Sequence, residues 1–180
     1  IKNKTLLLGN YKERNPVELS QAKLEAITVK PHFRFMRSDE KQKQLSPQRI
    51  RDIKYQTDGF YNISLFTKKE SLQKKLQYNL DTYIGPIIMN LKNTYNRPRP
   101  YKLDKDIKPV ISGPKHPAYP SGHATESYYI AYCLSKLYPD KKQLYLKTAN
   151  YIAENREYAG VHYKSDTDYG KILGQELSLL

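Results

Sequence analysis

Three clusters of cationic and histidine side chains follow one another in the second half of the chain. In chain order they are K-x6-R-P (Lys92, Arg99, Pro100), P-S-G-H (Pro120, Ser121, Gly122, His123) and R-x5-H-x3-D (Arg156, His162, Asp166). Guanidinium groups bind phosphate oxygens through paired hydrogen bonds, and lysine adds a compact positive charge. A phosphoryl group in transfer carries negative charge on its oxygens, which such cations stabilise. The clusters therefore predict a phosphate site that contains Lys92, Arg99 and Arg156.

The second cluster stands just before a segment that we expect to be helical. Backbone N–H groups at the start of a helix point outward and bind anions well. Gly122 has no side chain, so it would allow the backbone to approach a bound ligand closely. This arrangement adds main-chain donors to the predicted phosphate site.

Two histidines could supply acid, base or nucleophile chemistry. His162 precedes Asp166 by four residues, so one helical turn could bring them together. A carboxylate on one ring nitrogen fixes the tautomer and leaves the other nitrogen available for in-line attack. His123 would then protonate the leaving oxygen as a general acid.

The ordered set of three clusters resembles the three-part signature of the type 2 phosphatidic acid phosphatase and vanadium haloperoxidase superfamily. The resemblance covers roughly residues 80 to 175, and the spacings inside all three motifs match. It implies a helical bundle, a soluble acid-phosphatase-like activity and no metal or other cofactor. By position, His162 would be the nucleophile that forms a phosphohistidine, Asp166 would orient it, and His123 would be the general acid.

The resemblance also implies which groups hold the phosphoryl oxygens: Lys92, Arg99, Ser121, the Gly122 amide and Arg156. The third motif of the family usually begins Ser-Arg, whereas Asn155 precedes Arg156 here. We expect this change to be mild and to affect how Arg156 is braced. Residues 1–79 match no motif of the family, so their role stays unassigned.

Apolar periodicity predicts an all-α fold, a single-domain helical bundle over residues 1–180 with its catalytic motifs in 92–166. From Leu72 to Leu91 apolar residues recur at steps of three and four, and Gly85-Pro86 predicts a kink or break there. Further helices are expected over 17–27, from Ser46-Pro47 onward, and over 124–138, 143–158 and 168–180. The proline-rich stretch 96–120 predicts an extended, stiff active-site loop.

The remaining chemically interesting residues favour structural roles. We expect His116 to brace the site loop, His32 to be structural, Arg97 to be solvated, Cys133 to lie in the core, Asp168 to cap or solvate the last helix, and Tyr119 to pack or line the pocket wall. With one cysteine, neither an intramolecular disulfide nor a zinc site of the cysteine type can form.

The formal net charge of +13 fits nucleic acid, an anionic membrane surface or anionic small substrates. The ordered motifs favour a phosphorylated substrate over nucleic acid, and the charge leaves peripheral contact with an anionic membrane surface open. No run of about eighteen apolar residues is present, so we expect no segment that spans a bilayer. The chain begins at Ile1 rather than Met, which suggests that an upstream segment was removed, a cleaved signal peptide being one possibility. Together with the resemblance, this leads us to expect a periplasmic or secreted location.

The sequence thus predicts a metal-independent phosphatase for phosphate monoesters, with lipid phosphates and pyrophosphates as candidate substrates. A vanadium-dependent haloperoxidase is the alternative, because vanadate is nearly isosteric with phosphate and would occupy the same pocket. A non-enzymatic binder of nucleic acid or anionic surfaces is a lesser alternative, which leaves the ordered motifs unexplained.

Overall fold

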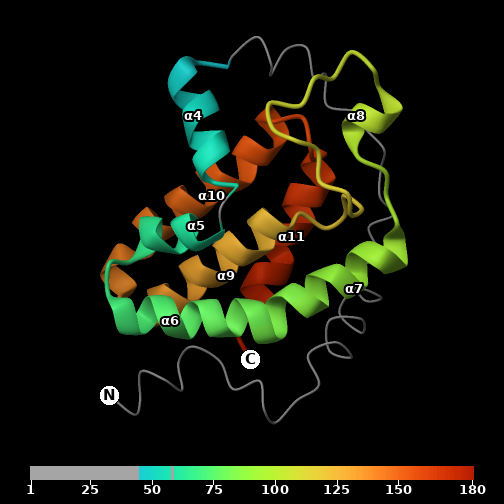
Figure 1. Cartoon of the computed structure of the whole chain (residues 1–180). Coiled ribbons are helices and arrows are strands. Elements are labelled where there is room, and N and C mark those ends of the chain that lie inside the picture. The colour runs from blue at the N-terminus through green and yellow to red at the C-terminus, as the bar shows by residue number, and fades with distance from the viewer. Residues whose placement is uncertain (1–44, 58) are drawn as a thin grey trace.

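The computed structural model describes residues 45–57 and 59–180, and all regular structure within them is helical (Figure 1). The elements are α4 (Pro47–Tyr55), α5 (Gly59–Phe66), α6 (Glu70–Asn79), the π-helical stretch η2 (Leu80–Ile84), α7 (Gly85–Tyr95), α8 (Pro100–Leu103), α9 (Gly122–Leu137), the 3₁₀ turn η3 (Pro139–Lys141), α10 (Lys142–Tyr158) and α11 (Lys164–Leu177). The predicted all-α bundle is confirmed. The helix expected over 17–27, and His32, lie outside the described residues.

Helix α9 is the central element of the bundle. It packs along α10 and α11 and also meets α5 and α7, so the other helices surround it (Figure 1). Most of its residues are buried, which explains why no single apolar stripe stands out in its sequence. The two catalytic motifs that flank α9 in the chain are carried by the elements that pack on it.

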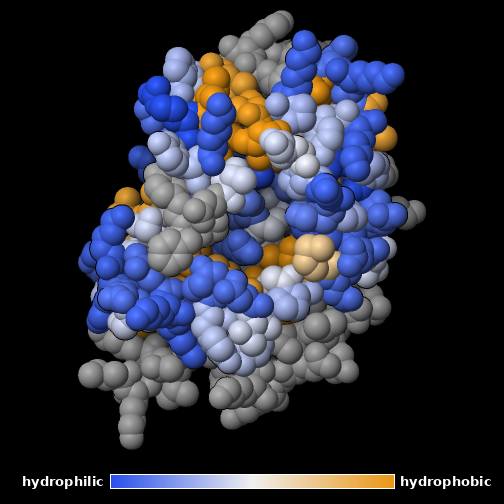
Figure 2. All heavy atoms as spheres, in the orientation of Figure 1, coloured by the Kyte–Doolittle hydropathy of each residue, from blue (hydrophilic) through white to orange (hydrophobic). Residues whose placement is uncertain are grey.

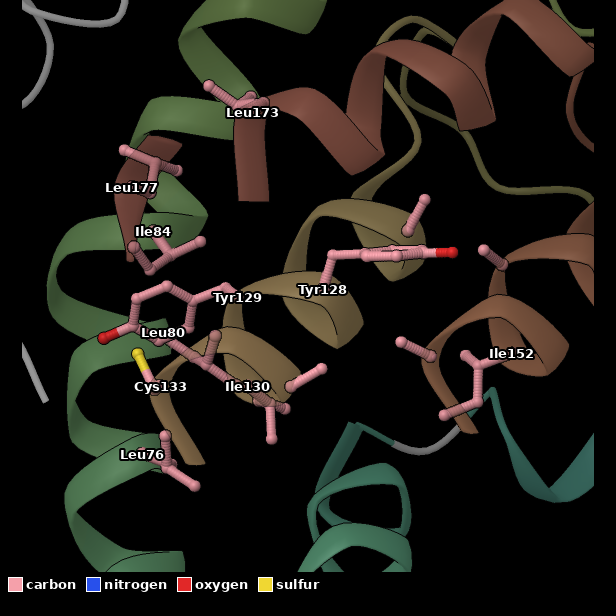
Figure 3. Close-up of a cluster of buried hydrophobic side chains, with 14 of the residues drawn as sticks. Leu76, Leu80, Ile84, Tyr128, Tyr129, Ile130, Cys133, Ile152, Leu173 and Leu177 are labelled. Atoms are coloured by element: carbon pink, nitrogen blue, oxygen red, sulfur yellow. The ribbon is translucent and has the colours of Figure 1, made fainter. Parts of the chain in front are cut away.

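The main apolar core draws side chains from α5, α6, η2, α7, α9, α10 and α11, and Figure 3 shows part of it. Its labelled members are Leu76, Leu80 and Ile84 from the α6–η2 segment, Tyr128, Tyr129, Ile130 and Cys133 from α9, Ile152 from α10, and Leu173 and Leu177 from α11. Cys133 is fully buried, as predicted. None of the helices in the described part of the chain is both long and apolar enough to cross a bilayer.

The predicted kink takes the form of a π-helical stretch rather than a break. Leu80–Ile84 forms wide turns, and α7 begins at Gly85 with Pro86 in its first turn. Proline lacks an N–H group and its ring displaces the preceding carbonyl, so a regular ladder cannot run through this position. The wider turn absorbs the mismatch and lets the helical rod continue into α7.

Two glycines of α11 allow it to approach α9 at backbone contact. A Cβ atom added at Gly174 would lie 2.4 Å from the carbonyl oxygen of Thr125, and one at Gly170 would lie 2.8 Å from Cβ of Ala124. The close packing brings the first turns of the two helices together. There the Ser121 N–H donates to the Asp166 carbonyl at 3.1 Å, which joins the second and third motifs.

The segment between α7 and α9 is less extended than predicted, because it contains the short helix α8. Elsewhere it is irregular. The Val110 N–H donates to the Ala159 carbonyl at 3.0 Å and ties the segment to the end of α10, while the Ala118 N–H donates to the Arg97 carbonyl at 2.8 Å and joins the two ends of the segment. Ser46 caps α4 as predicted, with its hydroxyl accepting from the Arg49 N–H. The loop therefore lies on the bundle at the end where the three motifs meet.

Candidate active site

A cavity of about 190 Å³ opens where the three motifs converge. It is lined by Gly85, Ile88, Met89, Lys92, Arg99, Pro114, His116, Gly122, His123, Glu126, Arg156 and His162. Six of the eight predicted site residues line this cavity. A seventh, Asp166, contacts His162 in the cavity wall. The described surface on the side shown in Figure 2 is mostly hydrophilic, with small apolar patches between the polar groups.

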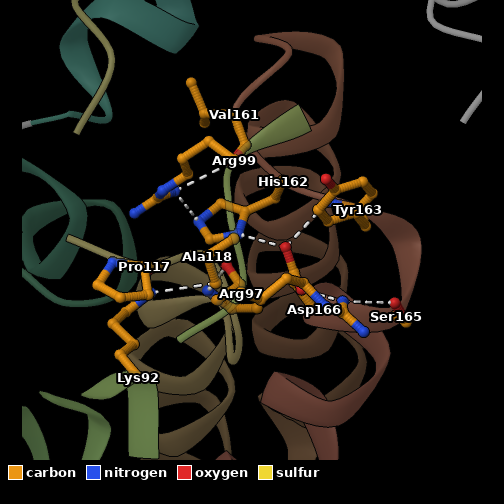
Figure 4. A network of polar contacts seen from close by, with 12 residues as sticks. Lys92, Arg97, Arg99, Pro117, Ala118, Val161, His162, Tyr163, Ser165 and Asp166 are labelled. Atoms are coloured by element: carbon orange, nitrogen blue, oxygen red, sulfur yellow. Dashed lines mark hydrogen bonds and ion pairs between the residues drawn. The ribbon is translucent and has the colours of Figure 1, made fainter. Parts of the chain in front are cut away.

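His162 and Asp166 form the centre of a buried polar network (Figure 4). Nδ1 of His162 lies 2.9 Å from Oδ2 of Asp166, and the same oxygen accepts the Tyr163 N–H at 2.9 Å. The expected helical turn between them is wrong: His162 precedes α11, and Asp166 caps the first turn of that helix. This cap also explains why α11 begins at Lys164 and not at the predicted residue 168.

The contact with a carboxylate fixes the proton of the His162 ring. A carboxylate accepts, so Nδ1 carries the hydrogen and Nε2 keeps its lone pair. Burial lowers the pKa of His162 well below its usual value, and the nearby cations Arg99, Lys92 and Arg156 lower it further. His162 is therefore neutral near pH 7 and presents an unprotonated nitrogen toward the cavity.

Arg97 is buried, and its expected solvation is wrong. It is 3% exposed, and its guanidinium pairs with Oδ1 of Asp166 and donates to the Ser165 hydroxyl at 2.8 Å (Figure 4). Its Cζ lies 4.6 Å from the ring centre of Tyr119, which packs in the core instead of lining the cavity. Arg97 escaped the sequence analysis because only its neighbour Arg99 falls on the motif spacing.

Opposing effects act on the pKa of the Asp166 carboxyl. Burial raises its pKa, whereas Arg97 and the Tyr163 N–H lower it. With an arginine on one oxygen and two donors on the other, the ionised form is the one that this network stabilises.

Arg99 reaches across the cavity wall to the histidine. Its Nη1 lies 3.0 Å from Nε2 of His162 and donates to the Val161 carbonyl at 3.0 Å (Figure 4). Its other nitrogens meet the carbonyl and Nδ1 of His116 at 3.0 and 2.9 Å. His116 thus lies on the loop that holds Arg99 in place, in line with the expected bracing role.

Lys92 projects from the last turn of α7 and is 2% exposed. Its ammonium donates to the carbonyls of Pro117 and Ala118 at 3.0 and 3.2 Å, so it ties the loop to the bundle (Figure 4). Burial, followed by repulsion from Arg99, lowers the pKa of Lys92 to about 7. The charge of this lysine therefore depends on pH near neutrality.

Arg156 comes from the last turn of α10 and is also buried. Its Nη1 lies 3.4 Å from the hydroxyl of Thr57, and burial and Arg99 lower its pKa to about 10. The preceding Asn155 does not contact Arg156 in any hydrogen bond of the described residues. It accepts from Nε of Arg49 and donates to Oε1 of Gln56, each at 2.8 Å.

The P-S-G-H motif forms the start of α9. Ser121 is fully buried, does not line the cavity, and caps the helix by accepting the Ala124 N–H at 3.3 Å. The Ser121 hydroxyl therefore stabilises the start of α9, whereas Gly122 lines the cavity. Amides of a first helical turn have no intrahelical acceptor, so this end of α9 can receive an anion.

His123 lies in the first turn of α9 and lines the same cavity. Its Nε2 is 2.8 Å from the carbonyl oxygen of Gln56 at the end of α4. Burial lowers the pKa of His123 well below its usual value, with Arg156 the largest charge acting in the same direction. The Gln56 carbonyl acts in the opposite direction.

Glu126 is a cavity residue that the sequence analysis missed. It lies on α9 one turn after His123 and shares the cavity with Lys92. Burial, and then Asp81, raise the pKa of Glu126 to about 7, while Lys92 lowers it. Its position three residues after a motif histidine on a helix was the available signal.

Outside the cavity, Asp168 pairs with Lys164 on the exposed face of α11. Across residues 45–57 and 59–180, no three histidine, cysteine, aspartate or glutamate side chains are grouped to hold a metal ion. The anion-binding groups of the cavity would suit vanadate as well as phosphate, since both are tetrahedral oxyanions.

The comparison with protein families decides the assignment. The model of the PAP2 superfamily matches residues 75–179. The chain belongs to the PAP2 superfamily. This confirms the resemblance on which the motifs were read, and it places the chain among the enzymes that hydrolyse phosphoric monoesters.

One solved structure shares the fold, and a second is less similar. LpxE from Aquifex aeolicus is 23% identical with a TM-score of 0.63, over 79% of this chain and 90% of that one. A protein described as the first transmembrane PAP2 type phosphatidylglycerolphosphate phosphatase from Bacillus subtilis is 21% identical with a TM-score of 0.47, over 97% and 89%. No curated protein matches this chain in sequence.

Proposed function

We propose that this PAP2 protein is a metal-independent phosphatase that hydrolyses phosphate monoesters through a phosphohistidine on His162. One observation carries the proposal. Nδ1 of His162 is held by Asp166, so the unprotonated Nε2 faces a cavity whose other walls carry Lys92, Arg99 and Arg156. A nitrogen nucleophile surrounded by cations is what in-line attack on a phosphoryl group requires.

In the first step, the Nε2 lone pair of His162 forms a bond to phosphorus while the bond to the leaving oxygen breaks. His123 in its imidazolium form gives a proton to that oxygen, so the leaving group departs as an alcohol. The negative charge of a bound phosphate offsets the cations that lower the pKa of His123 and thereby favours the protonated form.

In the second step, water attacks phosphorus and the N–P bond breaks. The neutral His123 accepts a proton from the water, and His162 regains its lone pair as inorganic phosphate forms. Asp166 keeps the proton on Nδ1 throughout and stabilises the ring while it carries the phosphoryl group.

The cations and the α9 amides supply the stabilisation that a metal would otherwise give. Arg99 and Arg156 can each present two N–H groups to phosphoryl oxygens, and Lys92 adds a third positive charge. The amide of Gly122 adds a donor at the positive end of α9. In this proposal the reaction needs no bound cofactor.

Several features favour a lipid phosphate among the monoesters. Family membership points to that class. Ile88 and Met89 form an apolar part of the cavity wall, where the leaving group would lie. The net charge of +13 would support peripheral contact with an anionic membrane surface on the periplasmic or secreted side. Nucleic acid is not part of this proposal.

Hydrolysis of p-nitrophenyl phosphate in excess EDTA, with and without orthovanadate, tests the proposal. We expect turnover that survives EDTA, is blocked by vanadate, and is lost in His162→Ala while the circular dichroism spectrum is retained. Base-quenched samples should hold a protein-bound phosphoryl group that acid-quenched samples have lost, because a phosphoramidate is stable in base and labile in acid. Turnover in His162→Ala comparable to wild type would exclude the nucleophile. Bromide oxidation with vanadate and peroxide, without phosphatase activity, would favour the haloperoxidase.

A further inference from the structure

Helix α4 ends against the histidine that we assign as the acid. The residue that caps its C-terminus, Gln56, lies outside residues 75–179 that match the family. The main-chain oxygen of Gln56 is 2.8 Å from Nε2 of His123. Figure 1 shows α4 beside α10, with its lower end directed toward α5 and α9.

This contact determines which nitrogen of His123 can give a proton. A carbonyl oxygen only accepts, so Nε2 carries a hydrogen and donates it to the Gln56 carbonyl in a hydrogen bond. The proton for the leaving oxygen must then sit on Nδ1, and the donating species is the imidazolium. The carbonyl favours that species, whereas burial and the neighbouring cations disfavour it.

The Gln56 carbonyl is itself held by buried amide side chains. Nδ2 of Asn62 donates to it at 2.7 Å, and the Gln56 side chain accepts from Nδ2 of Asn155 at 2.8 Å. Asn155 in turn accepts from Nε of Arg49 at 2.8 Å. Gln56, Asn62 and Asn155 are 3%, 5% and 0% exposed, so these bonds are shielded from water.

Asn155 occupies the position where the family motif usually has serine. An amide has a donor and an acceptor about 2 Å apart, so it joins Gln56 and Arg49 simultaneously. A serine hydroxyl is a single shorter group and could not bridge both. The departure from the motif therefore has a specific consequence in this chain: it connects α10 to the end of α4.

We infer that Gln56 and Asn155 are positioning residues for proton donation: the chain Arg49–Asn155–Gln56 holds the Gln56 carbonyl on Nε2 of His123 and aims Nδ1 at the leaving oxygen. The inference rests on the proposed function, because it presumes that His123 is the acid. It gives the segment before the family region a part in the reaction.

The test compares a poor and a good leaving group in the full-length protein. Phenyl phosphate needs protonation of its leaving oxygen, whereas p-nitrophenyl phosphate leaves readily without it. A positioned acid is worth about 10²–10⁴-fold, so His123→Ala should reduce kcat/KM for phenyl phosphate by that much more than for p-nitrophenyl phosphate. Gln56→Ala and Asn155→Ala should lower the phenyl to p-nitrophenyl ratio by about tenfold. A defect in phosphate binding through Arg156 would lower both substrates equally and leave the ratio unchanged.

Arg51→Ala is the control. Arg51 is exposed on α4, and its Nη2 donates to Oε1 of Gln48 in the same helix at 2.7 Å, so its loss leaves the bonds that join Arg49, Asn155 and Gln56 in place. This variant should leave the ratio unchanged. If the alanine variants do not fold by circular dichroism, Asn155→Ser takes their place, because it keeps a polar group and removes the bridge.

The outcomes distinguish a failure of this inference from a failure of the proposed function. A selective loss in His123→Ala without one in the Gln56 and Asn155 variants would overturn this inference and leave the proposed function intact. An equal ratio change in Arg51→Ala would overturn it too. No selectivity in His123→Ala would remove the acid assignment and the inference together. Long-range ¹H–¹⁵N NMR gives a readout independent of turnover: the neutral His123 ring should carry its hydrogen on Nε2, and an Nδ1–H tautomer would overturn the inference.

Discussion

Nη1 of Arg99 lies 3.0 Å from Nε2 of His162, the nitrogen that we propose attacks phosphorus. In the substrate-free site, an N–H of the Arg99 guanidinium thus donates a hydrogen bond to the lone pair on Nε2 of His162. A phosphate that enters must draw this hydrogen bond onto its own oxygen, which frees Nε2 and places phosphorus before it. Arg99 thereby links phosphate binding to exposure of the nucleophile.

Replacement of Arg99 by lysine should impair catalysis although the positive charge is kept. An ammonium cannot hold the carbonyls of His116 and Val161 and also reach a phosphoryl oxygen, as the planar guanidinium does. Loss of one such donor costs about 10²–10³-fold in kcat. Steady-state kinetics with p-nitrophenyl phosphate measures this. Lys102→Ala, on the exposed side of α8, is the control, and wild-type rates in Arg99→Lys would contradict the role.

Removal of the Arg97 guanidinium should both destabilise the fold and slow turnover. Arg97→Met would leave Asp166 buried without its arginine, and breaking a buried pair from one side costs about 3–5 kcal/mol. The pKa of Asp166 would rise, so His162 would lose its ionised partner. Urea unfolding and kcat report the two effects. Lys164→Met breaks the exposed pair with Asp168 and should cost at most about 1 kcal/mol. Equal stabilities of the two variants would refute the expectation.

The affinity for phosphate should fall as the pH rises through neutrality, because Lys92 loses its proton at a pKa of about 7. The lowered pKa means that the charged form is present below pH 7 and is lost above it. A mildly acidic pH optimum would follow, since the lowered pKa of His162 keeps that ring neutral there. Inhibition by inorganic phosphate, measured from pH 5 to 9, tests this.

Lys92→Arg provides the decisive comparison, because arginine stays protonated over this range. The inhibition constants of variant and wild type should diverge above pH 7, with phosphate binding to the variant weakening less. Ionisation of phosphate itself is the same in both experiments and cancels. Parallel curves would show that Lys92 is not the titrating group.

The sequence predicted the bundle and the cavity residues because both depend on spacing along the chain. Apolar steps of three and four residues identify helices without tertiary information, as α6 and α7 show. The three motifs meet because α9 and α11 pack closely at their first turns, which the glycines of α11 permit.

The parts that were missed depend on contacts between distant segments. Arg97 looks solvated in a polar, proline-rich stretch, and only the fold brings it to Asp166. Likewise Gln56 is an unremarkable polar residue until the end of α4 meets His123. The predicted start of α11, residue 168, is late because the apolar residues that indicated this helix begin at Ile172, whereas its first turn is polar and is capped by Asp166.

Gly174→Ala should lower the free energy of unfolding by about 1–3 kcal/mol, as overpacked sites do. The added methyl would meet the carbonyl oxygen of Thr125 and the amide nitrogen of Tyr129, which are rigid backbone atoms. Urea unfolding measures the change. Gln175→Ala, the next residue and exposed, is the control and should have little effect. Unchanged stability in Gly174→Ala would mean that the two helices can separate at little cost.

Glu126 should discriminate between leaving groups by their charge. In the part of the chain that the structure describes, no hydrogen bond or ion pair engages its carboxyl, which lines the cavity one turn beyond His123. Its pKa of about 7 makes it neutral in mild acid and negative above neutrality. A negative carboxylate would repel a leaving group that carries a second phosphate, so pyrophosphates should be poorer substrates than monoesters at pH 8.

Glu126→Gln should therefore raise kcat/KM for pyrophosphate relative to p-nitrophenyl phosphate by about tenfold at pH 8. This corresponds to about 1.4 kcal/mol, the size of a charge interaction across a few ångströms of partly solvated protein. At pH 5.5 wild type carries a protonated carboxyl, so the variant and wild type should show the same ratio. Steady-state kinetics with both substrates at both pH values measures the effect. A ratio that changes equally at the two pH values would indicate altered shape rather than removed charge.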